Sequence, residues 1–211
     1  MLTKMLLRKP AGTVAQGLTY VSSATSTGST IVIPASSEIG DLAVLWDAAE
    51  GDSYYPDPVV PGDWTELVGL YSFTTAIIAT FKVSRKKLVS GDPGTTITGM
   101  NGDLLNRKLI VILRPNNAIG TITQVEQAAE AVDTNPADQV KSTQTAPYVV
   151  IGGSYCDVAP AFSSAWADQS FTNNKLLAGY KIFNSSPASV TIGLSTYGSD
   201  NMLVSGSIKV T

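Results

Sequence analysis

Acidic and aromatic side chains concentrate in one stretch of the sequence, at Asp47, Glu50, Asp52, Tyr54, Tyr55, Asp57 and Trp64. Aromatic rings can stack on sugars, and carboxylates can bind hydroxyl groups or calcium. The stretch has no Asp-x-Asp ligand spacing, so we predict no metal there. Tyr54, Tyr55, Asp57 and Trp64 are the candidate contacts to a ligand or partner. The alternative is a solvated loop whose tyrosines lie on a sheet edge or in a subunit contact.

The chain has no histidine, which limits the catalytic chemistry that its side chains could perform. This removes the usual general base, the Ser-His-Asp arrangement and most transition-metal sites. Cys156 is the single thiol, and without an activating histidine we expect it to be packed in the interior. A glycosidase would need two carboxylates facing one cleft. We predict a non-enzymatic protein without a cofactor, with a hydrolase as the least favoured alternative.

The charge and hydropathy of the sequence limit the classes of partner that the chain can bind. The formal net charge is −3, which offers no electrostatic basis for binding nucleic acid. The sequence lacks both the uninterrupted apolar core of a signal peptide and the roughly 18 to 20 apolar residues of a membrane helix. We therefore predict no nucleic-acid or membrane partner, and synthesis in a reducing cytoplasm.

Two basic segments allow more than one interpretation. The run Arg85-Lys86-Lys87 could bind an acidic neighbour, although a solvated turn is the favoured interpretation. Residues 1–17 form an N-terminal arm, in which a short helix would place Leu2, Met5 and Leu6 on one face. Because so short a helix is marginal alone, we expect an ordered arm to pack on another subunit.

The chain is 15% charged, with many Ser, Thr and Gly residues, a composition that favours strands and turns. Apolar alternation between turn residues predicts strands at 18–22, 30–33, 41–46, 64–68, 77–83, 95–98, 109–113, 148–154, 175–183, 190–195 and 203–210. The first two should pair with each other, 41–46 should be covered on both faces, and Gly69 should end its strand. Gln124 to Val132 has good helix formers and predicts a helix, with a strand as the alternative.

The two halves of the chain repeat an order of features. Phe81-Lys82-Val83 and Tyr180-Lys181-Ile182 each precede a polar turn, a Thr-Ile strand and a closing apolar strand, and Trp64 and Trp166 hold similar places. Coincidence among β sequences is the alternative. A repeat predicts halves at about 18–115 and 146–211 that share one core in residues 18–211. The predicted fold is an all-β, jelly-roll-like antiparallel sandwich, since two barrels would be marginal in size.

Four segments resemble a domain of phage virion proteins and some bacterial surface proteins, and they are Gly40-Asp41-Leu42-Ala43-Val44, Pro61-Gly62-Asp63-Trp64-Thr65, Thr80-Phe81-Lys82-Val83 and Leu109 to Arg114. Asp63 departs from the family pattern, as does Leu113-Arg114-Pro115 where an aromatic residue is usual. The resemblance implies a bacteriophage virion structural protein of the tail, baseplate, fibre or head-decoration type, without catalysis.

The partners that follow are other virion proteins and further copies of the chain. The protein would be made in the host bacterial cytoplasm and would reside in the virion. The alternative function is a carbohydrate- or receptor-binding module at a tail tip, with a host-surface glycan as ligand.

Overall fold

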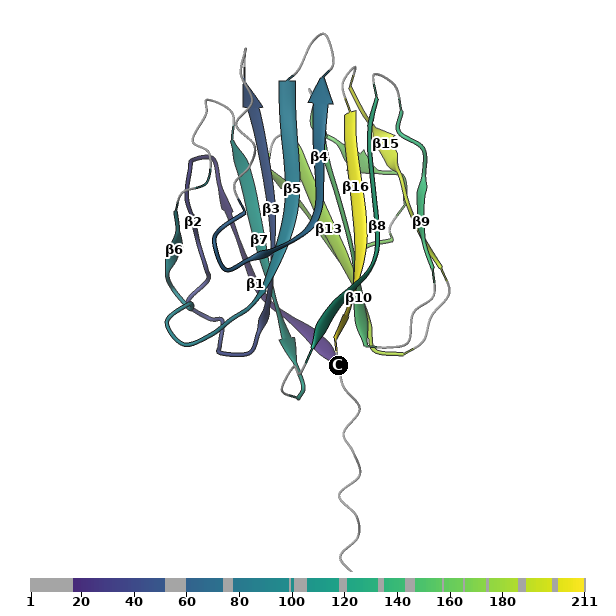
Figure 1. Ribbon diagram of the computed structural model, residues 1–211. Coiled ribbons are helices and arrows are strands. Elements are labelled where there is room, and N and C mark those ends of the chain that lie inside the picture. Colours follow the sequence, from purple (N-terminus) through teal and green to yellow (C-terminus); the bar gives the residue numbers. More distant parts are fainter. Residues whose placement is uncertain are drawn as a thin grey trace, which may run out of the picture.

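The computed structural model describes residues 17–51, 60–73, 78–98, 100, 106–117, 121–132, 135–142, 147–156, 158–164, 166–173, 175–185, 189–198 and 201–210. Within these ranges the regular elements are strands, and the ladders between them are antiparallel. The predicted all-β class is confirmed, and the arrangement is consistent with a β-sandwich (Figure 1).

The first half of the chain builds one five-stranded sheet. Its strands, in spatial order, are β1 (Leu18–Ser26), β7 (Arg107–Pro115), β3 (Leu42–Gly51), β5 (Ile78–Lys87) and β4 (Thr65–Phe73). A small second sheet pairs β2 (Ile31–Val32) with β6 (Thr96–Ile97).

The second half builds another five-stranded sheet. Its strands, in spatial order, are β8 (Ile122–Val132), β16 (Asn201–Val210), β10 (Tyr148–Cys156), β13 (Leu176–Phe183) and β12 (Gln169–Asn173). Two small sheets pair β9 (Gln139–Lys141) with β14 (Val190–Ile192) and β11 (Ala161–Phe162) with β15 (Leu194–Thr196).

Both large sheets have the same strand order. Reading β1-β7-β3-β5-β4 beside β8-β16-β10-β13-β12 matches each strand with its counterpart along the chain, and β2-β6 matches β9-β14. Strands β11 and β15 are additions of the second half. The segments that repeat in the sequence occupy matching places, because β5 corresponds to β13 and β7 to β16. The matching strand order gives the repeat seen in the sequence a structural counterpart.

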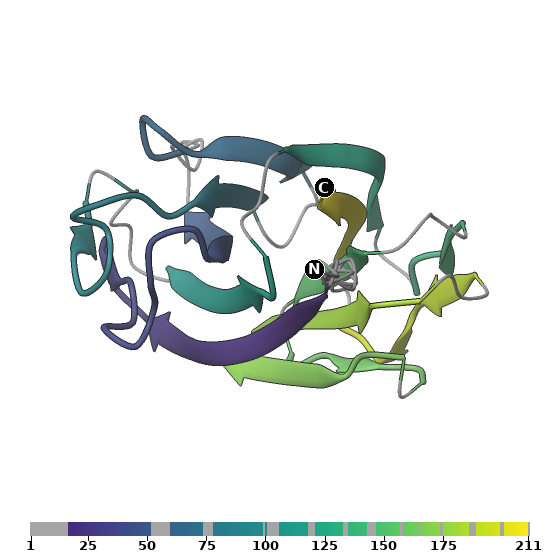
Figure 2. The same cartoon turned by 90° about the horizontal axis from the view of Figure 1, so that it is seen from below.

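Apolar side chains from both halves meet between the large sheets. Leu42, Val44 and Trp46 of β3 share one cluster with Val149 and Ile151 of β10. Viewed from below, the first half lies on the left and the second on the right (Figure 2). We call this cluster the shared core.

Each central strand also buries its other face. Ala43 and Leu45 of β3 pack in a second cluster with residues of β2 and β6, while Tyr148 and Val150 of β10 pack in a third. The predicted double coverage of 41–46 is confirmed. Such coverage requires a nearly continuous apolar run, because successive side chains point to opposite faces.

The two large sheets come into close contact at Gly152 and Gly153 of β10. The Trp46 indole Nε1 donates a hydrogen bond of 3.2 Å to the carbonyl of Gly152 in the other sheet. A Cβ on Gly153 would lie 2.7 Å from Phe81 Cζ and 2.9 Å from Trp46 Cδ1. Glycine therefore makes room for two aromatic rings of the opposite half.

A second junction joins the two halves at the start of β1. The Leu18 amide donates to Asn184 Oδ1 at 2.8 Å, and Asn184 Nδ2 donates to the Leu18 carbonyl at 3.3 Å. Nearby, the ring of Tyr20 lies 6.1 Å from that of Tyr180. Backbone and ring contacts thus close the side of the sandwich where β1 and β13 meet.

The helix predicted for Gln124 to Val132 is wrong, because this segment belongs to strand β8 and pairs with β16. Its helix formers are overridden by the backbone partners that β16 supplies. The predicted pairing of 18–22 with 30–33 is also wrong, since β1 pairs with β7 and β2 with β6. Gly69 does not end its strand, which continues through it to Phe73.

Candidate partner-binding surface

Most of the predicted contact residues lie outside the described ranges. These are Tyr54, Tyr55 and Asp57 of the acidic and aromatic stretch, and Leu2, Met5 and Leu6 of the arm. The remaining one, Trp64, is 8% exposed and packs in the second cluster with Ile33 and Leu45. Its indole packs against other apolar side chains in the interior, so in this structure it is not exposed for stacking on a sugar.

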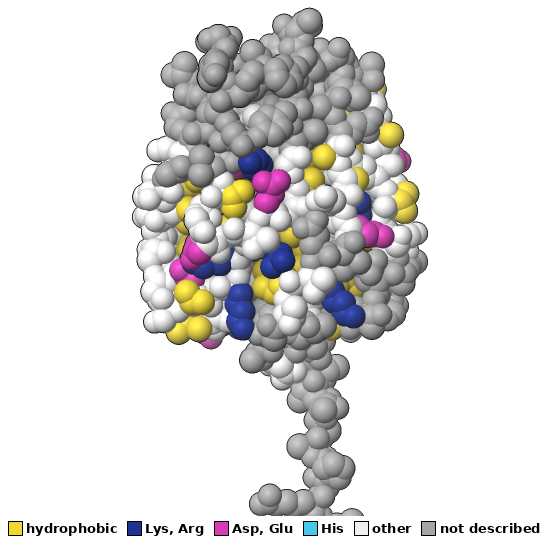
Figure 3. All heavy atoms as spheres, in the orientation of Figure 1, with side chains coloured by type: hydrophobic (Ala, Val, Ile, Leu, Met, Phe, Trp, Pro, Cys, Tyr) yellow, Lys and Arg dark blue, Asp and Glu magenta, His cyan; other side chains and the backbone are white. Residues whose placement is uncertain are grey.

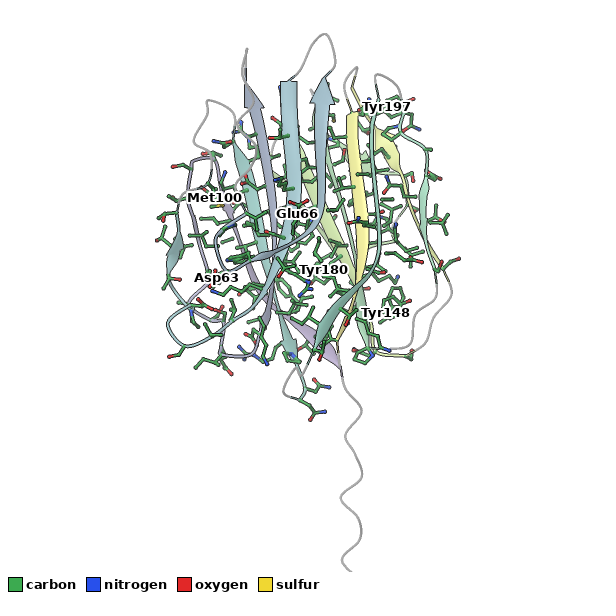
Figure 4. The ribbon with its side chains drawn as sticks, viewed as in Figure 1. Asp63, Glu66, Met100, Tyr148, Tyr180 and Tyr197 are labelled. Carbon is green, nitrogen blue, oxygen red and sulfur yellow. The ribbon has the colours of Figure 1, made fainter. Side chains whose placement is uncertain are left out.

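Trp64 instead anchors a tight turn. Its amide donates to the Pro61 carbonyl at 2.8 Å, which closes the Pro61-Gly62-Asp63 turn. With the indole buried, the turn presents the neighbouring Asp63 to solvent. Asp63 lies at the lower left of the molecule, away from Tyr148 and Tyr197 of the second half (Figure 4).

Asp63 forms an ion pair with Lys86 of β5, whose ammonium group also pairs with Asp92 at 2.7 Å. Burial alone would lower the pKa of Lys86, but its hydrogen bonds to Asp63 and Asp92 outweigh burial and raise that pKa above its ordinary value. Lys86 is therefore held in a fixed position by two carboxylates. The run Arg85-Lys86-Lys87 is the end of a strand, so the predicted solvated turn is wrong.

An open hollow of about 450 Å³ lies beside this ion pair, lined by Asp63, Thr65, Arg85, Lys86, Lys87, Val89, Thr121 and Ile122. Arg85 lies opposite Thr65 in the ladder between β5 and β4. The other wall comes from the start of β8 in the second half. The hollow thus opens where the two large sheets meet.

Arg85 is the unusual residue of this hollow. Its Nε is buried, and among the described residues no atom accepts a hydrogen bond from it. Burial lowers the pKa of the guanidinium group, although arginine stays charged in proteins. The structure therefore holds a half-buried cation with an unmatched donor.

A second hollow of about 380 Å³ lies nearby and is lined in part by Glu38, Ile39, Lys87 and Arg114. Arg114 donates to both carboxylate oxygens of Asp41, at 3.0 and 2.9 Å, and pairs with Glu38 at 2.9 Å. Hydrogen bonding to Asp41 is the main cause that raises the pKa of Arg114. In contrast to Arg85 Nε, this guanidinium group has its partners among the described residues.

Two large apolar side chains are exposed beside these hollows. Ile39 is 68% exposed and Val89 is 52% exposed. Their chain neighbours Gly40 and Leu88 are joined by a backbone hydrogen bond of 2.8 Å. Ile39 lines the second hollow, Val89 the first, and Lys87 both. We call the two hollows with Ile39 and Val89 the end surface.

The end surface lies at the lower end of the first half, where β3 begins and β5 and β7 end (Figure 1). On the face shown in Figure 3, charged and apolar side chains are interspersed over this lower region. Sequence reasoning identified the basic run but did not identify its position beside exposed apolar residues. The one feature of the sequence that could have indicated this surface is that Val89 follows closely after Arg85 along the chain.

Other chemically capable residues belong to the interior. Asp47 of the predicted acidic cluster is buried in β3 and pairs with Lys108 of β7 at 2.8 Å. Burial raises the pKa of Asp47, and the attraction of Lys108 opposes this shift. Cys156 is buried, and its Sγ lies 2.8 Å from the Val158 carbonyl. In the described part of the chain, no three His, Cys, Asp or Glu residues are grouped so as to hold a metal ion.

The described residues contain no helix of the length and hydropathy needed to cross a membrane. Comparison of the chain with protein-family models, with curated proteins and with solved structures finds no match.

Proposed function

We propose that the chain is a non-enzymatic virion structural protein that assembles with other phage particle proteins at the tail, the baseplate or the head surface. The single observation that carries this proposal is the end surface, where Ile39 and Val89 are exposed next to charged side chains. Apolar centres with polar rims are typical of protein interfaces.

The ion pairs of the end surface add to this support. Arg114, Asp41 and Glu38 are held by one another, as are Lys86, Asp63 and Asp92. Charged groups that are already paired present a fixed pattern to a partner, and such patterns favour specific over nonspecific contacts.

The proposal includes a jelly-roll-like description of the sandwich and assembly as a homo-oligomer. Each large sheet ends in edge strands, which are β1 and β4 in the first and β8 and β12 in the second. Edge strands carry backbone groups that can pair with another chain. Copies of the chain could therefore contact one another along these edges.

The direct test is to search for the protein in purified particles of the phage whose genome encodes it. An antibody raised against the chain should label intact particles, and mass spectrometry should detect it in a fixed ratio to the major particle protein. Particles that lack the chain, while the infected cell contains it in free form, would contradict the proposal.

A further inference from the structure

Arg85 of β5 has a buried hydrogen-bond donor, Nε, that no described residue accepts from. A buried polar hydrogen without an acceptor costs about 1–3 kcal/mol, so such groups usually have a structural or functional reason. The Arg85 side chain as a whole is half-buried and lines an open hollow, so an acceptor from outside the chain can approach the guanidinium group there.

Two carboxylates at and beside this hollow are already paired with Lys86. Asp63 lines it but pairs with Lys86, and Asp92 pairs with the same lysine. These two carboxylates bracket the ammonium group of Lys86, whose side chain is only 9% exposed. Among the described residues, no carboxylate pairs with Arg85, whereas its neighbour Lys86 pairs with two.

The charge of the lining favours an anion. Among the described lining residues, Arg85, Lys86 and Lys87 are cations and Asp63 is an acid, while Asp92 pairs with Lys86 from beside the hollow. The chain as a whole carries a net charge of −3, so this positive excess is local. An anionic group that enters the hollow would be attracted by the guanidinium group of Arg85.

The remaining lining residues indicate the kind of anion. Thr65 and Thr121 contribute hydroxyl groups, while Val89 and Ile122 contribute apolar surface. A guanidinium fork matches a planar carboxylate with two parallel hydrogen bonds. The methylene groups of a Glu or Asp side chain would in turn contact the apolar wall.

We propose that Arg85 is the centre of a binding site for a carboxylate side chain from an acidic segment of a partner protein. The inference rests on the proposed assembly function and names the partner chemistry at one part of the end surface. Phosphate is a less suitable ligand, because Asp63 and the apolar wall would face its additional charge.

The experiment measures fluorescence anisotropy of a labelled hexaglutamate peptide with the purified full-length chain, and uses a hexaglutamine peptide as the neutral probe. The variants are Arg85→Gln, Arg85→Lys and the control Lys181→Gln, which removes one positive charge from strand β13 of the other sheet. Thermal unfolding followed by circular dichroism verifies that each variant is folded.

Hexaglutamate should bind the wild-type chain and hexaglutamine should not. Arg85→Gln should weaken binding about tenfold, since it removes a charge-assisted hydrogen-bond pair. Arg85→Lys keeps the charge without the fork and should be intermediate. Lys181→Gln should change the affinity less than about twofold, because distant surface charges are screened by salt.

Equal binding by the Arg85→Gln and wild-type chains would overturn the inference. So would inorganic phosphate that displaces hexaglutamate at equal concentration, since the site would then recognise anions in general. If the peptide binds as expected while the chain is missing from particles, the assembly function fails and the carboxylate site stands. If the chain is in particles but Arg85 has no effect on peptide binding, the site alone fails.

Discussion

The two halves of the molecule share a strand order and differ in how they handle polar groups. The first half buries an ion pair, Asp47 with Lys108, at the centre of its sheet. In the second half a neutral network joins the Ser205 hydroxyl, which donates to Gln139, to the Leu203 carbonyl, which accepts from Gln139 Nε2 at 3.1 Å, and Lys141 of β9 is also buried. The same path of strands therefore tolerates two different polar interiors.

This difference indicates what defines the fold. Apolar side chains in the central strands recur in both halves and meet in the shared core, so the strand order follows from them. Polar chemistry is free to vary between the halves. The first half combines its ion pairs with the exposed residues Ile39 and Val89, which is why we assign the binding role to it.

We expect the largest effect on stability from a substitution that breaks the buried ion pair of the first half. Asp47→Ala should lower the free energy of unfolding by about 3–5 kcal/mol, because it removes the carboxylate that pairs with the buried Lys108 ammonium group. Urea denaturation of the purified variant measures this change.

The matched control removes both charges. The double variant Asp47→Leu with Lys108→Met should be within about 1 kcal/mol of the wild type or more stable. If the single variant proved as stable as the wild type, the ion pair would have no structural role and the contrast between the halves would be lost.

The next effect concerns the contact between the halves. Gly153→Ala should lower the free energy of unfolding by about 1–3 kcal/mol, because its Cβ would crowd Phe81 and Trp46. Gly62→Ala is the control, since a Cβ there meets no atom within 4 Å. Equal urea midpoints for the two variants would contradict the close approach of the sheets.

The neutral network of the second half should be weaker than the ion pair. Ser205→Ala should cost about 1 kcal/mol, because it removes one hydrogen bond to Gln139. Ser164→Ala, at an exposed position, should have no measurable effect. A loss for Ser205→Ala as large as that for Asp47→Ala would show that the two interiors do not differ in energy.

The smallest effect is a pH dependence at Lys86. Its pKa in the folded chain is raised above 10.5 by Asp63 and Asp92, so its contribution to stability is fully present below that value. The contribution is lost as the pH rises through the raised pKa. Urea denaturation across this alkaline range should show a smaller decline for Lys86→Gln than for the wild type, and identical declines would argue against the ion pairs.

Much of the fold could be predicted from the sequence because its signals are local. Asp41 to Trp46 is an apolar run, and its central, doubly covered position followed from that pattern. The order of the two halves was visible in the repeated aromatic-Lys-aliphatic steps of β5 and β13. Strand β8 was predicted as a helix because its residues favour a helix, and its partner β16 lies far along the chain.

The candidate surface was less predictable because it depends on tertiary contacts. Trp64 stands beside acids and tyrosines in the sequence, yet its indole faces the interior because the turn before it reverses the chain. Ile39 and Val89 are far apart in the sequence and become neighbours through pairing at the start of β3. Arg85 stands out because the carboxylates beside it pair with Lys86, and the sequence does not show which cation each carboxylate pairs with.

The most direct test of the central claim compares apolar residues of the two halves in assembled particles. Ile39→Asp with Val89→Asp alters the end surface, whereas Val140→Asp with Val158→Asp alters residues of the second half that are 59% and 41% exposed. Quantitative mass spectrometry of purified particles should show that the first double variant is excluded, while the second is incorporated at the wild-type level. Normal incorporation of the Ile39 and Val89 variant, with loss of the Val140 and Val158 variant, would contradict the assignment of binding to the first half.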